Sequence, residues 1–287
     1  MTGLRAAVDA ATAQLREVGV PSARADALAL LAHVRGVPGA ELQRQLVLGA
    51  TLDAATRQAY DELVAQRRAR VPLQHLTGTA PFRHLELAVG PGVFVPRPET
   101  ELLVDLALRA VADVSAPTVV DLCTGSGAIA LAIKHELPAA DVSAIELDPM
   151  AHAWAARNRD NLGLDVEIDC GAAESAFPDL DGGVDLVVSN PPYIPVGMVP
   201  IDPEVRDHDP EVALYGGSED GLRIPIVVAA RAAQLLRPGG VLIMEHADSQ
   251  GDSLPAALRQ QGVWSRVSDH LDLTERPRAV TAVRRAW

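Results

Sequence analysis

The stretch SNPPYIP (residues 189–195) contains an asparagine, two prolines and a tyrosine directly after VDLVVS (residues 184–189), an apolar run typical of a buried strand. Because proline has no N–H group to donate to a sheet, the two prolines end the strand and leave their carbonyl groups unpaired. The Asn190 side-chain oxygen and the Pro191 carbonyl could accept both hydrogens of a planar –NH2 group, with Tyr193 as a wall for stacking. The alternative interpretation is a proline-rich loop with a turn-forming asparagine.

A second candidate is DLCTGSGAIA (residues 121–130), in which a strand ends near Asp121 and a Gly-x-Gly turn leads into a helix. Glycines let the backbone turn tightly and approach a ligand at the helix N-terminus. The turn lacks the third glycine of the dinucleotide fingerprint and the Gly-Lys-Ser/Thr ending of a P-loop. It therefore predicts a ligand-holding turn without a phosphate signature, or else an ordinary strand-to-helix connection.

The third candidate is Glu146, which ends the next apolar segment, VSAIE (residues 142–146). An acid about 20 residues after a glycine turn can accept the hydroxyl hydrogens of a ribose at the edge of a parallel sheet. Asp148 fits the plainer role of a helix-capping or surface acid better. Taken together, Glu146 and the glycine turn favour a ligand that contains a nucleoside.

Alternation of strand, turn and helix begins at residue 118 and positions these candidates. Strands are predicted at 118–122, 142–146, 166–169, 184–189 and 240–246, and helices at 128–137, 150–162 and 222–236. Such βα units predict an α/β fold, with a parallel sheet covered by helices on both faces. The segments 263–270 and 277–285 read as a terminal hairpin that adds one antiparallel strand.

The region before residue 70 has apolar residues three and four apart and reads as a small helical bundle, with Asp53 as the cap of its fourth helix. Proline, glycine and alternating residues over 71–101 predict a short β-hairpin with an extended connection, followed by a helix through Leu108. We expect a helical substrate-binding domain at 1–75, a β-hairpin linker at 76–98 and a catalytic domain at 99–287.

Charge is unevenly distributed along the 287 residues. Residues 1–80 contain nine arginines and seven acidic residues, and the other 16 basic and 31 acidic residues give residues 81–287 a net charge of −15. An acidic catalytic region repels a phosphate backbone, so direct binding of nucleic acid is disfavoured. The basic stretch RRAR (residues 67–70) is interpreted as a solvated helix end.

The sequence shows no pattern typical of a membrane span, a signal peptide or a disulfide framework. No apolar run reaches the ~20 residues that span a bilayer, and the amphipathic N-terminus does not resemble a signal peptide. Cys123 and Cys170 are too few for a disulfide framework and lack metal-ligand spacing. We expect a cytoplasmic protein.

The three motifs resemble those of class I S-adenosylmethionine-dependent methyltransferases that modify planar amino nitrogens. The segments 72–82, 89–104, 209–222 and 235–250 are similar, more closely, to the HemK/PrmC family, which methylates the glutamine amide nitrogen (N5) in the Gly-Gly-Gln motif of peptide-chain release factors. The resemblance runs from about Val71 to the C-terminus, with a compatible helical region before it. It implies a Rossmann-like class I fold, a release factor as partner, S-adenosylmethionine as cofactor with S-adenosylhomocysteine as product, and no metal.

The resemblance also implies roles for individual residues. Asn190, Pro191, Pro192 and Tyr193 match the catalytic loop that holds the substrate amide, and Arg97 and Glu99 match a family segment near the pocket, here assigned to substrate binding. Expected contacts to the cofactor come from Asp121, Cys123, Thr124, Gly125, Ser126, Gly127, Glu146, Ala173 and Asn190. The chain is expected to act as a monomer, and His208 and His246 to be structural or peripheral.

The chain departs from the family pattern at several points. Ala172 stands where the family often has an aspartate near adenine, EHADSQ (residues 245–250) replaces the usual Glu-Ile-Gly, and LTERPRAV (residues 273–280) replaces an Ala-Gly-Arg-Asp-Arg stretch. Three alternatives remain: an adenine-N6 methyltransferase, since adenine also presents a planar –NH2; a glutamine methyltransferase for another translation protein; and a binding protein that has lost the chemistry. The acidic balance and the segment VPRPETE (residues 95–101) disfavour the first.

Overall fold

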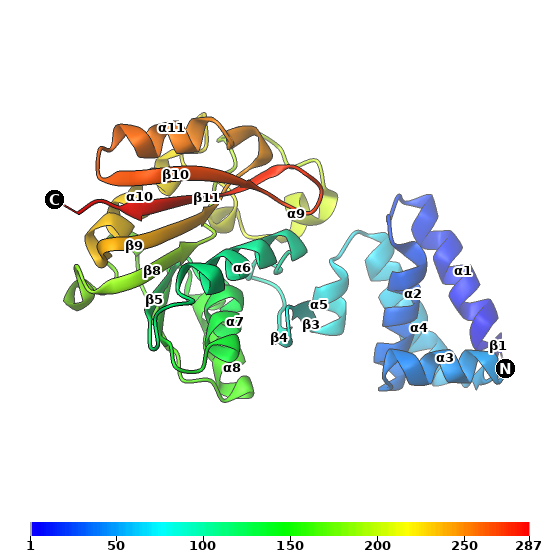
Figure 1. Cartoon of the computed structure of the whole chain (residues 1–287). Helices are drawn as coiled ribbons and strands as arrows, with labels where there is room; N and C mark the ends of the chain where they lie inside the picture. The colour runs from blue at the N-terminus through cyan, green and yellow to red at the C-terminus, as the bar shows by residue number, and fades with distance from the viewer. Residues whose placement is uncertain (1, 287) are drawn as a thin grey trace. The chain divides into compact units, whose positions relative to one another are not determined.

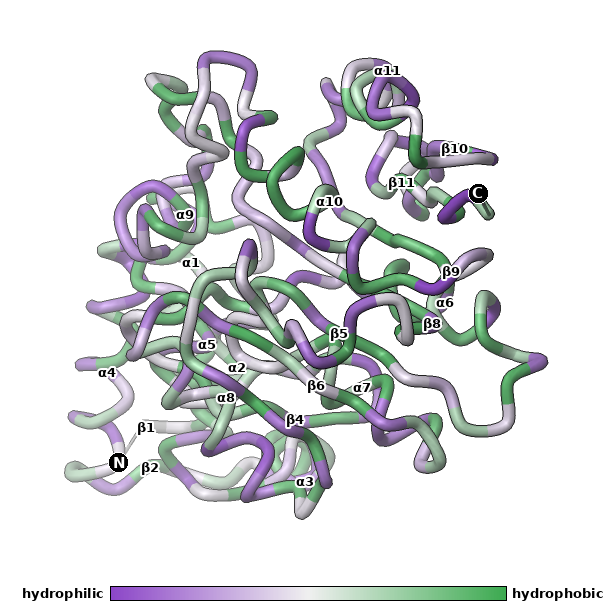
Figure 2. Tube along the Cα trace, turned by 90° about the vertical axis from the view of Figure 1, so that its left-hand side faces the viewer, coloured by the Kyte–Doolittle hydropathy of each residue, from purple (hydrophilic) through white to green (hydrophobic). Residues whose placement is uncertain are grey.

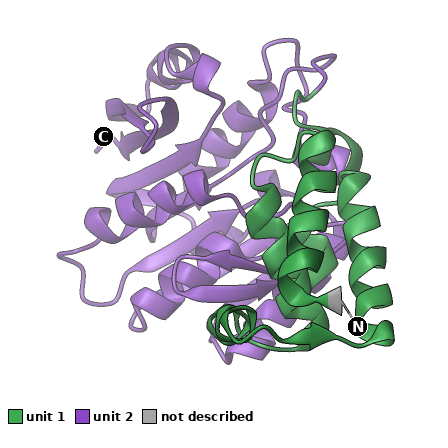
Figure 3. Ribbon diagram, turned by 90° about the vertical axis from the view of Figure 1, so that its right-hand side faces the viewer, with its two compact units in different colours: residues 1–79, 200–208 green, residues 80–199, 209–287 purple. Residues whose placement is uncertain are grey.

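A computed structural model describes residues 2–286 of the chain. The chain divides into two compact units, one of residues 1–79 with 200–208 and the other of residues 80–199 with 209–287 (Figure 3). The boundaries expected at residues 75 and 98 stay predictions. The inclusion of residues 200–208 in the N-terminal unit was not indicated by the sequence.

The N-terminal unit is the helical bundle that the apolar periodicity predicts. Its helices are α1 (Leu4–Glu17), α2 (Ala23–Arg35), α3 (Gly39–Val47), α4 (Ala54–Arg68), α5 (Leu73–Thr77) and α9 (Pro203–His208). The short strands β1 (Thr2–Gly3) and β2 (Thr51–Leu52) pair beside them. Asp53 caps α4 as predicted, because its carboxylate accepts the backbone N–H of Thr56 at 2.8 Å. The buried Tyr60 hydroxyl donates to the Ala27 carbonyl at 2.9 Å.

The basic stretch at the end of α4 was interpreted as a solvated helix end, but two of its arginines are engaged in ion pairs. Arg67 is buried, with its guanidinium 2.7 Å from both Asp26 Oδ2 and Glu204 Oε1, and Arg70 lies 3.0 Å from the same Glu204 oxygen. Only Arg68 is substantially exposed. The interpretation was wrong because these cations meet acids from α2 and α9, which lie far away in the sequence.

The second unit is built on a seven-stranded sheet in the order β10-β11-β9-β8-β5-β6-β7. Figure 1 shows the part of this sheet from β10 to β5. The strands are β5 (Thr118–Leu122), β6 (Asp141–Glu146), β7 (Glu167–Cys170), β8 (Val184–Ser189), β9 (Leu236–Glu245), β10 (Trp264–Leu271) and β11 (Pro277–Arg284). The five strands from β9 to β7 are parallel, and β11 pairs antiparallel with both β9 and β10. The parallel sheet and the terminal hairpin are confirmed.

Helices cover both faces of this sheet, as expected for a doubly covered α/β fold. One buried cluster joins the sheet to α6 (Glu101–Ala110), α7 (Ala128–Glu136) and α8 (Pro149–Leu162), and another joins it to α10 (Arg223–Leu235) and α11 (Ser253–Gln260). The strands are apolar on both sides: Val188 packs into the first cluster and Val187 into the second. Figure 2 shows hydrophobic residues along the strands of the sheet.

A short hairpin precedes the sheet, as predicted. It consists of β3 (Thr79–Phe82) and β4 (Leu85–Ala88), and a 3-10 turn (Pro98–Thr100) then leads into α6. Arg83 in the hairpin turn binds Glu136 of α7 and lies 2.8 Å from Asp105 of α6. Asn158 of α8 accepts the Ala88 N–H at 2.7 Å. These contacts hold the hairpin against the helices α6, α7 and α8.

Several elements differ from the sequence prediction or add to it. The helices α5, α9 and α11 were not predicted, and β9 begins at Leu236 rather than near residue 240. No helix within residues 2–286 is long and apolar enough to cross a membrane.

Candidate active site

Four polar side chains lie at the carboxyl ends of four adjacent strands. Glu245 ends β9, Asn190 directly follows β8, Asp121 is the penultimate residue of β5, and Glu146 ends β6. Because β9, β8, β5 and β6 are parallel neighbours, these ends lie along one edge of the sheet. Open α/β sheets bind ligands at this edge.

Asp121 is a fully buried carboxylate whose two oxygens differ in their hydrogen bonding. Its Oδ2 accepts the Thr124 hydroxyl at 2.6 Å and the Ala130 N–H at 3.2 Å. Its Oδ1 is buried and has no hydrogen-bond partner within residues 2–286. Burial raises the pKa of Asp121 to about 7, and the nearby Glu146 acts in the same direction. An unpaired oxygen of this kind is costly unless a ligand donates to it.

The glycine turn between β5 and α7 takes the open shape that its sequence predicts. Gly125 and Gly127 have φ of 59° and 84°, and Gly127 is the N-cap of α7. A Cβ atom added to Gly125 would have no atom within 4 Å, whereas one at Gly127 would lie 2.9 Å from the Leu131 side chain. Gly125 thus borders open space, while Gly127 packs closely. Of the expected neighbours, Cys123 is half-buried, and Thr124 and Ser126 are buried.

Glu146 is tied directly to this turn. Its Oε2 accepts the Gly125 N–H at 2.8 Å, and its Oε1 accepts the Asp148 N–H at 2.9 Å. Burial raises the pKa of Glu146, while these backbone donors act against that rise. A carboxylate has about four acceptor sites, so Glu146 keeps the capacity to accept two hydroxyl hydrogens. Asp148 caps α8 through Met150 N at 2.7 Å, the plainer role that was considered for it.

The segment after β7 supplies no acid of the kind that the family often has. Ala172 precedes a 3-10 turn that begins at Ala173, and both residues are half-buried. Ala173 packs against the apolar cluster around α10. Residues 172 and 173 can therefore offer a ligand only their backbone groups and an apolar surface.

The Asn-Pro-Pro-Tyr loop is held from two sides. Asn190 is half-buried, and its Nδ2 donates to the Thr100 hydroxyl at 3.3 Å. The Tyr193 hydroxyl donates to Glu245 Oε1 at 3.2 Å. The Tyr193 carbonyl accepts Gln250 Nε2 at 3.0 Å, and Pro191 is buried while Pro192 is half-buried. The structure therefore fixes the loop at both its first and its last residue.

Arg97 and Glu99, assigned to substrate binding from the resemblance, lie less directly at the site. The Arg97 guanidinium pairs with the buried Asp209 at 2.8 Å and lies 5.0 Å from the centre of the Phe94 ring. Glu99 is exposed. The next residue, Thr100, is the one that bonds to Asn190, so this segment does reach the loop.

Sequence reasoning missed two site residues, Thr100 and Glu245. Glu245 ends the apolar run VLIME just as Glu146 ends VSAIE, so the same signal could have found it. Thr100 gave no such signal. His246, expected to be structural, is buried, with Nδ1 2.8 Å from the Ala247 carbonyl and Nε2 2.8 Å from Asp269 Oδ1.

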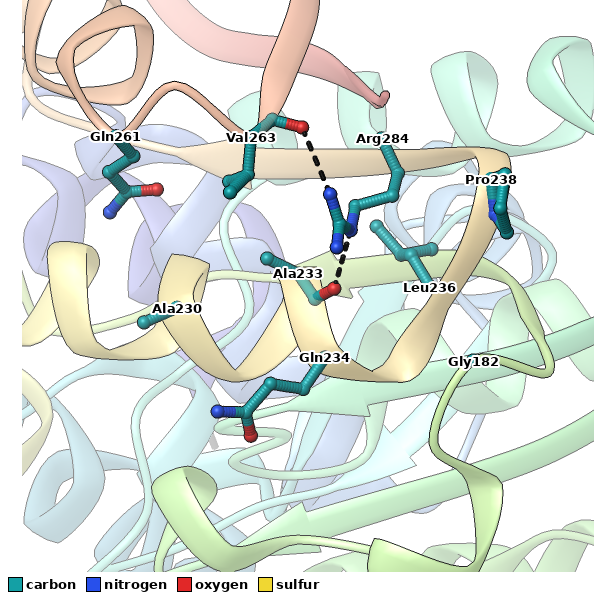
Figure 4. Close-up of a pocket in the computed structure, with 9 residues that line it drawn as sticks. All are labelled: Gly182, Ala230, Ala233, Gln234, Leu236, Pro238, Gln261, Val263 and Arg284. Carbon is teal, nitrogen blue, oxygen red and sulfur yellow. Dashed lines mark hydrogen bonds between the residues drawn. The ribbon is translucent and has the colours of Figure 1, made fainter. Parts of the chain in front are cut away.

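A cavity of about 570 Å³ lies elsewhere in the second unit, between α10, β9 and the final hairpin (Figure 4). Gly182, just before β8, and Leu236, the first residue of β9, line it, so it is at the amino edge of the parallel strands. Arg284 crosses it and donates to the Ala233 carbonyl at 2.7 Å and the Val263 carbonyl at 3.4 Å. None of the candidate residues lines this cavity, so we do not assign the site to it.

Comparisons with known proteins identify two family domains in the chain. Residues 6–78 match a family described as the PrmC N-terminal domain, and residues 85–198 match the methyltransferase small domain. A methyltransferase from Pyrococcus furiosus superposes with a TM-score of 0.52 at 15% identity, over 79% of this chain and 98% of that one. The 16S rRNA N2 G1207 methyltransferase RsmC of T. thermophilus, solved with AdoMet and guanosine, superposes with a TM-score of 0.51 at 20% identity, over 72% of this chain and 50% of that one. These two likenesses show a methyltransferase fold.

Sequence relatives are much closer. A release factor glutamine methyltransferase of Streptomyces coelicolor is 52% identical over 98% of each chain, and one of Bifidobacterium longum is 44% identical over 96% of this chain and 98% of that protein. A 4-amino-L-phenylalanine/4-methylamino-L-phenylalanine methyltransferase of Streptomyces pristinaespiralis is 42% identical over 92% of this chain and 90% of that protein. On matches of this identity and length, the chain belongs to the release factor glutamine methyltransferase family.

Proposed function

We propose that this protein transfers a methyl group from S-adenosylmethionine to the side-chain amide nitrogen of the glutamine in the Gly-Gly-Gln motif of peptide-chain release factors. The observation that carries the proposal is the row of Asn190, Asp121 and Glu146 along one sheet edge, in a chain that matches release factor glutamine methyltransferases over 98% of its length. The loop after β8 offers acceptors for a planar –NH2 group, and the glycine turn offers a place for the methyl donor.

The residues present fit S-adenosylmethionine. Asp121 Oδ1, which accepts no hydrogen bond from any of residues 2–286, is a buried acceptor suited to the positively charged amino group of the methionine part. The space beside Gly125 and the spare acceptor capacity of Glu146 suit the chain and ribose next to it. We assign Cys123, Thr124, Ser126 and Gly127 to the backbone of this turn, and Ala173 to the apolar wall near adenine.

When bound, the cofactor supplies a methyl group on an electrophilic sulfonium. An amide nitrogen is a weak nucleophile, because its lone pair is delocalised into the carbonyl. In our proposal Asn190 Oδ1 and the Pro191 carbonyl accept its two hydrogens, which favours a pyramidal nitrogen as the reaction proceeds. Holding the nitrogen in line in this way can contribute about 7–11 kcal/mol to lowering the barrier.

Tyr193 and Pro192 complete the substrate side in this proposal, with the tyrosine ring as a wall for the planar amide. Arg97 and Glu99 lie on the segment that leads to Thr100, and we propose that they approach the bound peptide. The proton lost by the substrate nitrogen passes to water, since His246 is buried and engaged with Asp269.

We further propose a protein substrate rather than nucleic acid, because residues 81–287 carry a net charge of −15. Neither Cys123 nor Cys170 forms a disulfide, which supports a reducing compartment such as the cytoplasm. We propose a monomer as the active form.

A substrate comparison tests the proposed function, and one relative makes a second candidate worth including. The Streptomyces pristinaespiralis relative is named for methylation of 4-amino-L-phenylalanine, which also carries a planar –NH2 group. We would measure kcat/KM for a purified release factor, for 4-amino-L-phenylalanine and for an adenine-containing oligonucleotide. We expect the release factor to be preferred by orders of magnitude. A higher kcat/KM for 4-amino-L-phenylalanine or for the oligonucleotide than for the release factor would contradict the proposal.

A further inference from the structure

Gln250 is a buried side-chain amide that binds the Asn-Pro-Pro-Tyr loop, and the proposed methyl transfer does not yet use it. It is 3% exposed, in the 3-10 turn (Asp248–Gln250) that follows β9. Its Nε2 donates to the Tyr193 carbonyl at 3.0 Å and to the Asp220 carbonyl at 2.9 Å, and its Oε1 accepts the Ala247 N–H at 3.0 Å. Two carbonyls need a donor and one N–H needs an acceptor, so only this orientation of the amide satisfies all three groups.

The peptide group between Tyr193 and Ile194 is held on both of its sides. Its carbonyl accepts Gln250 Nε2, and its N–H donates to the Leu214 carbonyl at 2.8 Å. With the N–H bond alone, this peptide group could rotate about a single contact. The second bond removes that freedom, because it comes from a buried residue whose own N–H donates to the Ala247 carbonyl at 2.9 Å.

The turn before α10 is the other partner of the Gln250 amide. The Asp220 carboxylate accepts the Ser218 hydroxyl at 2.6 Å and the Leu222 N–H at 3.1 Å, so the turn is fixed within itself. The Ser218 carbonyl accepts the Val196 N–H at 2.9 Å. Gln250 therefore joins a turn and a loop that are already bonded to each other, and its loss should loosen their contact without unfolding either.

The two prolines carry the effect of this anchor to the substrate acceptors. Proline fixes its own φ at about −65°, and a residue that precedes a proline is restricted to extended backbone. Both restrictions apply here, because Asn190 precedes Pro191 and Pro191 precedes Pro192. At the other end of the loop, Ser189 is fixed in the sheet, with its hydroxyl donating to a carbonyl of β5 at 2.5 Å. Between two fixed ends, the position of Tyr193 sets the direction of the Pro191 carbonyl.

We propose that Gln250 is a positioning residue for methyl transfer: by fixing the Tyr193 carbonyl it directs the Pro191 carbonyl toward the substrate nitrogen. This inference rests on the proposed function, in which the Pro191 carbonyl accepts one hydrogen of the glutamine amide. Gln250 acts through the loop. The cofactor residues Asp121 and Glu146 lie on β5 and β6, which β8 separates from β9, so cofactor binding should not depend on this contact.

Gln250→Met tests the proposal, because methionine keeps the length of the side chain and donates no hydrogen bond. We expect kcat with a release factor to fall about 10- to 100-fold, as for a small misplacement of a reacting group. The KM for the release factor and the affinity for S-adenosylmethionine should stay close to the wild-type values, because a contact that acts in the transition state affects kcat. A side chain that merely stabilised the fold would lower the melting temperature without this split between kcat and KM.

Gln261→Met is the matched control, since it makes the same chemical change at the amino edge of the parallel strands. Gln261 lines the cavity in Figure 4, and its Oε1 accepts Trp264 Nε1 at 2.5 Å. This variant also loses a side-chain hydrogen bond, so its melting temperature should fall while its kcat stays that of the wild type. Equal kcat values for Gln250→Met and Gln261→Met would overturn the inference.

Asn190→Ala allows a second, independent measurement. In the proposed function, Asn190 Oδ1 and the Pro191 carbonyl hold one –NH2 group between them, so their effects on kcat should not be additive. We expect Gln250→Met to slow the transfer of labelled methyl by a smaller factor in the Asn190→Ala background than in the wild type. The same factor in both backgrounds would show that Gln250 does not act through the pair of acceptors.

The outcomes separate the inference from the proposed function. If the wild-type protein methylates no release factor, the proposed function itself fails. If the wild type is active and Gln250→Met keeps its kcat, only the positioning role is wrong. Should Gln250→Met fail to fold, Gln250→Glu decides, because glutamate keeps the acceptor for the Ala247 N–H but has at most one hydrogen for two carbonyls. A wild-type kcat in Gln250→Glu would then overturn the inference.

Discussion

Asp121 presents the clearest single-residue test of the cofactor site, because its Oδ1 is buried without a partner within residues 2–286. We expect Asp121→Asn to weaken binding of S-adenosylmethionine about 10- to 100-fold, since an amide cannot form a charge-assisted bond with the amino group of the cofactor. Isothermal titration calorimetry would measure this. Asp148→Asn, which changes an acid that caps α8, is the control and should bind normally.

The same residue predicts a pH dependence. Burial raises the pKa of Asp121 to about 7, so below that pH the free protein holds it protonated and unable to accept a cation as a carboxylate. Affinity for the cofactor should therefore increase from pH 6 to about pH 7.5, a range over which the α-amino group of the cofactor stays mostly charged. In Asp121→Asn this change should vanish. Equal affinities of the wild type at the two pH values would count against the assignment.

At the residue scale, the sequence revealed those site residues that follow a simple positional rule. Asp121, Glu146 and Asn190 each lie at or next to the end of an apolar run, and the ends of such runs can be found from hydrophobicity alone. Thr100 escaped because its role depends on a contact with Asn190, 90 residues away. The engagement of Arg97 by Asp209 escaped for the same reason, since pairing across 112 residues depends on tertiary packing.

At the element scale, the turn before α10 supports the catalytic loop through a glycine. Gly221 has a φ of 73°, and a Cβ added there would lie 2.1 Å from the Tyr193 carbonyl oxygen. Gly197 has a φ of 89° but no atom within 4 Å of such a Cβ. Both alanine variants bear the left-handed backbone cost of about 1–2 kcal/mol, but only Gly221→Ala must also displace the loop.

Stability and rate together distinguish these two glycine variants. Chemical denaturation should show Gly221→Ala to be clearly less stable than Gly197→Ala, and kcat should fall in Gly221→Ala because Tyr193 moves. If the two variants are equally stable and equally active, then the close approach of Gly221 to the loop has no role in holding it.

Elements with strong periodicity were predictable, and short ones were not. The strands at 118–122 and 184–189 match the structure residue for residue, because both are apolar runs with clear ends. The helices α9 and α11 have six and eight residues, too short for an apolar period to stand out. The helix α9 is held by Glu204 and its arginine partners, a contact that no local pattern shows.

At the scale of the molecule, a buried ion cluster distinguishes the N-terminal unit. Arg67 is 3% exposed between Asp26 and Glu204, whereas the Arg24–Asp9 pair is more than half exposed. We expect Arg67→Ala to cost about 3–5 kcal/mol, because Asp26 loses its buried cation and Glu204 keeps only Arg70. Arg24→Ala should cost less than about 1 kcal/mol. Urea unfolding would compare them, and similar costs would show that the cluster is not a stabilising centre.

Stability of the whole chain should also depend on pH through the buried acids Asp121 and Glu245. Asp121 and Glu245 have pKa values raised to about 7, so their contribution is present at low pH and is lost as pH rises through 7. The pKa of Asp272 is lowered to about 2 by Thr274 and neighbouring donors, so its contribution does not change in this range. His270, with its pKa lowered by burial, acts in the opposite direction.

We therefore expect the cofactor-free protein to melt at a lower temperature at pH 8 than at pH 6.5. The double variant Asp121→Asn with Glu245→Gln isolates the cause, because it keeps His270 and removes both acids. Its melting temperature should fall less than that of the wild type over the same range. An equal fall in both proteins would assign the effect to other groups.

The acidic balance of residues 81–287 was visible in the sequence, but the inclusion of residues 200–208 in the N-terminal unit was not. A chain excursion of this kind depends on which distant acids meet Arg67 and Arg70. No composition change marks where it begins or ends, so only the folded chain reveals it.

Transfer of radiolabelled methyl from S-adenosylmethionine to a purified release factor, compared with its Gln→Ala variant in the Gly-Gly-Gln motif, tests the central claim most directly. The proposed function predicts label on the wild-type release factor and none on the variant. Equal labelling of both would place the methyl group on another residue. No label on either, with cofactor binding intact, would contradict the proposed substrate.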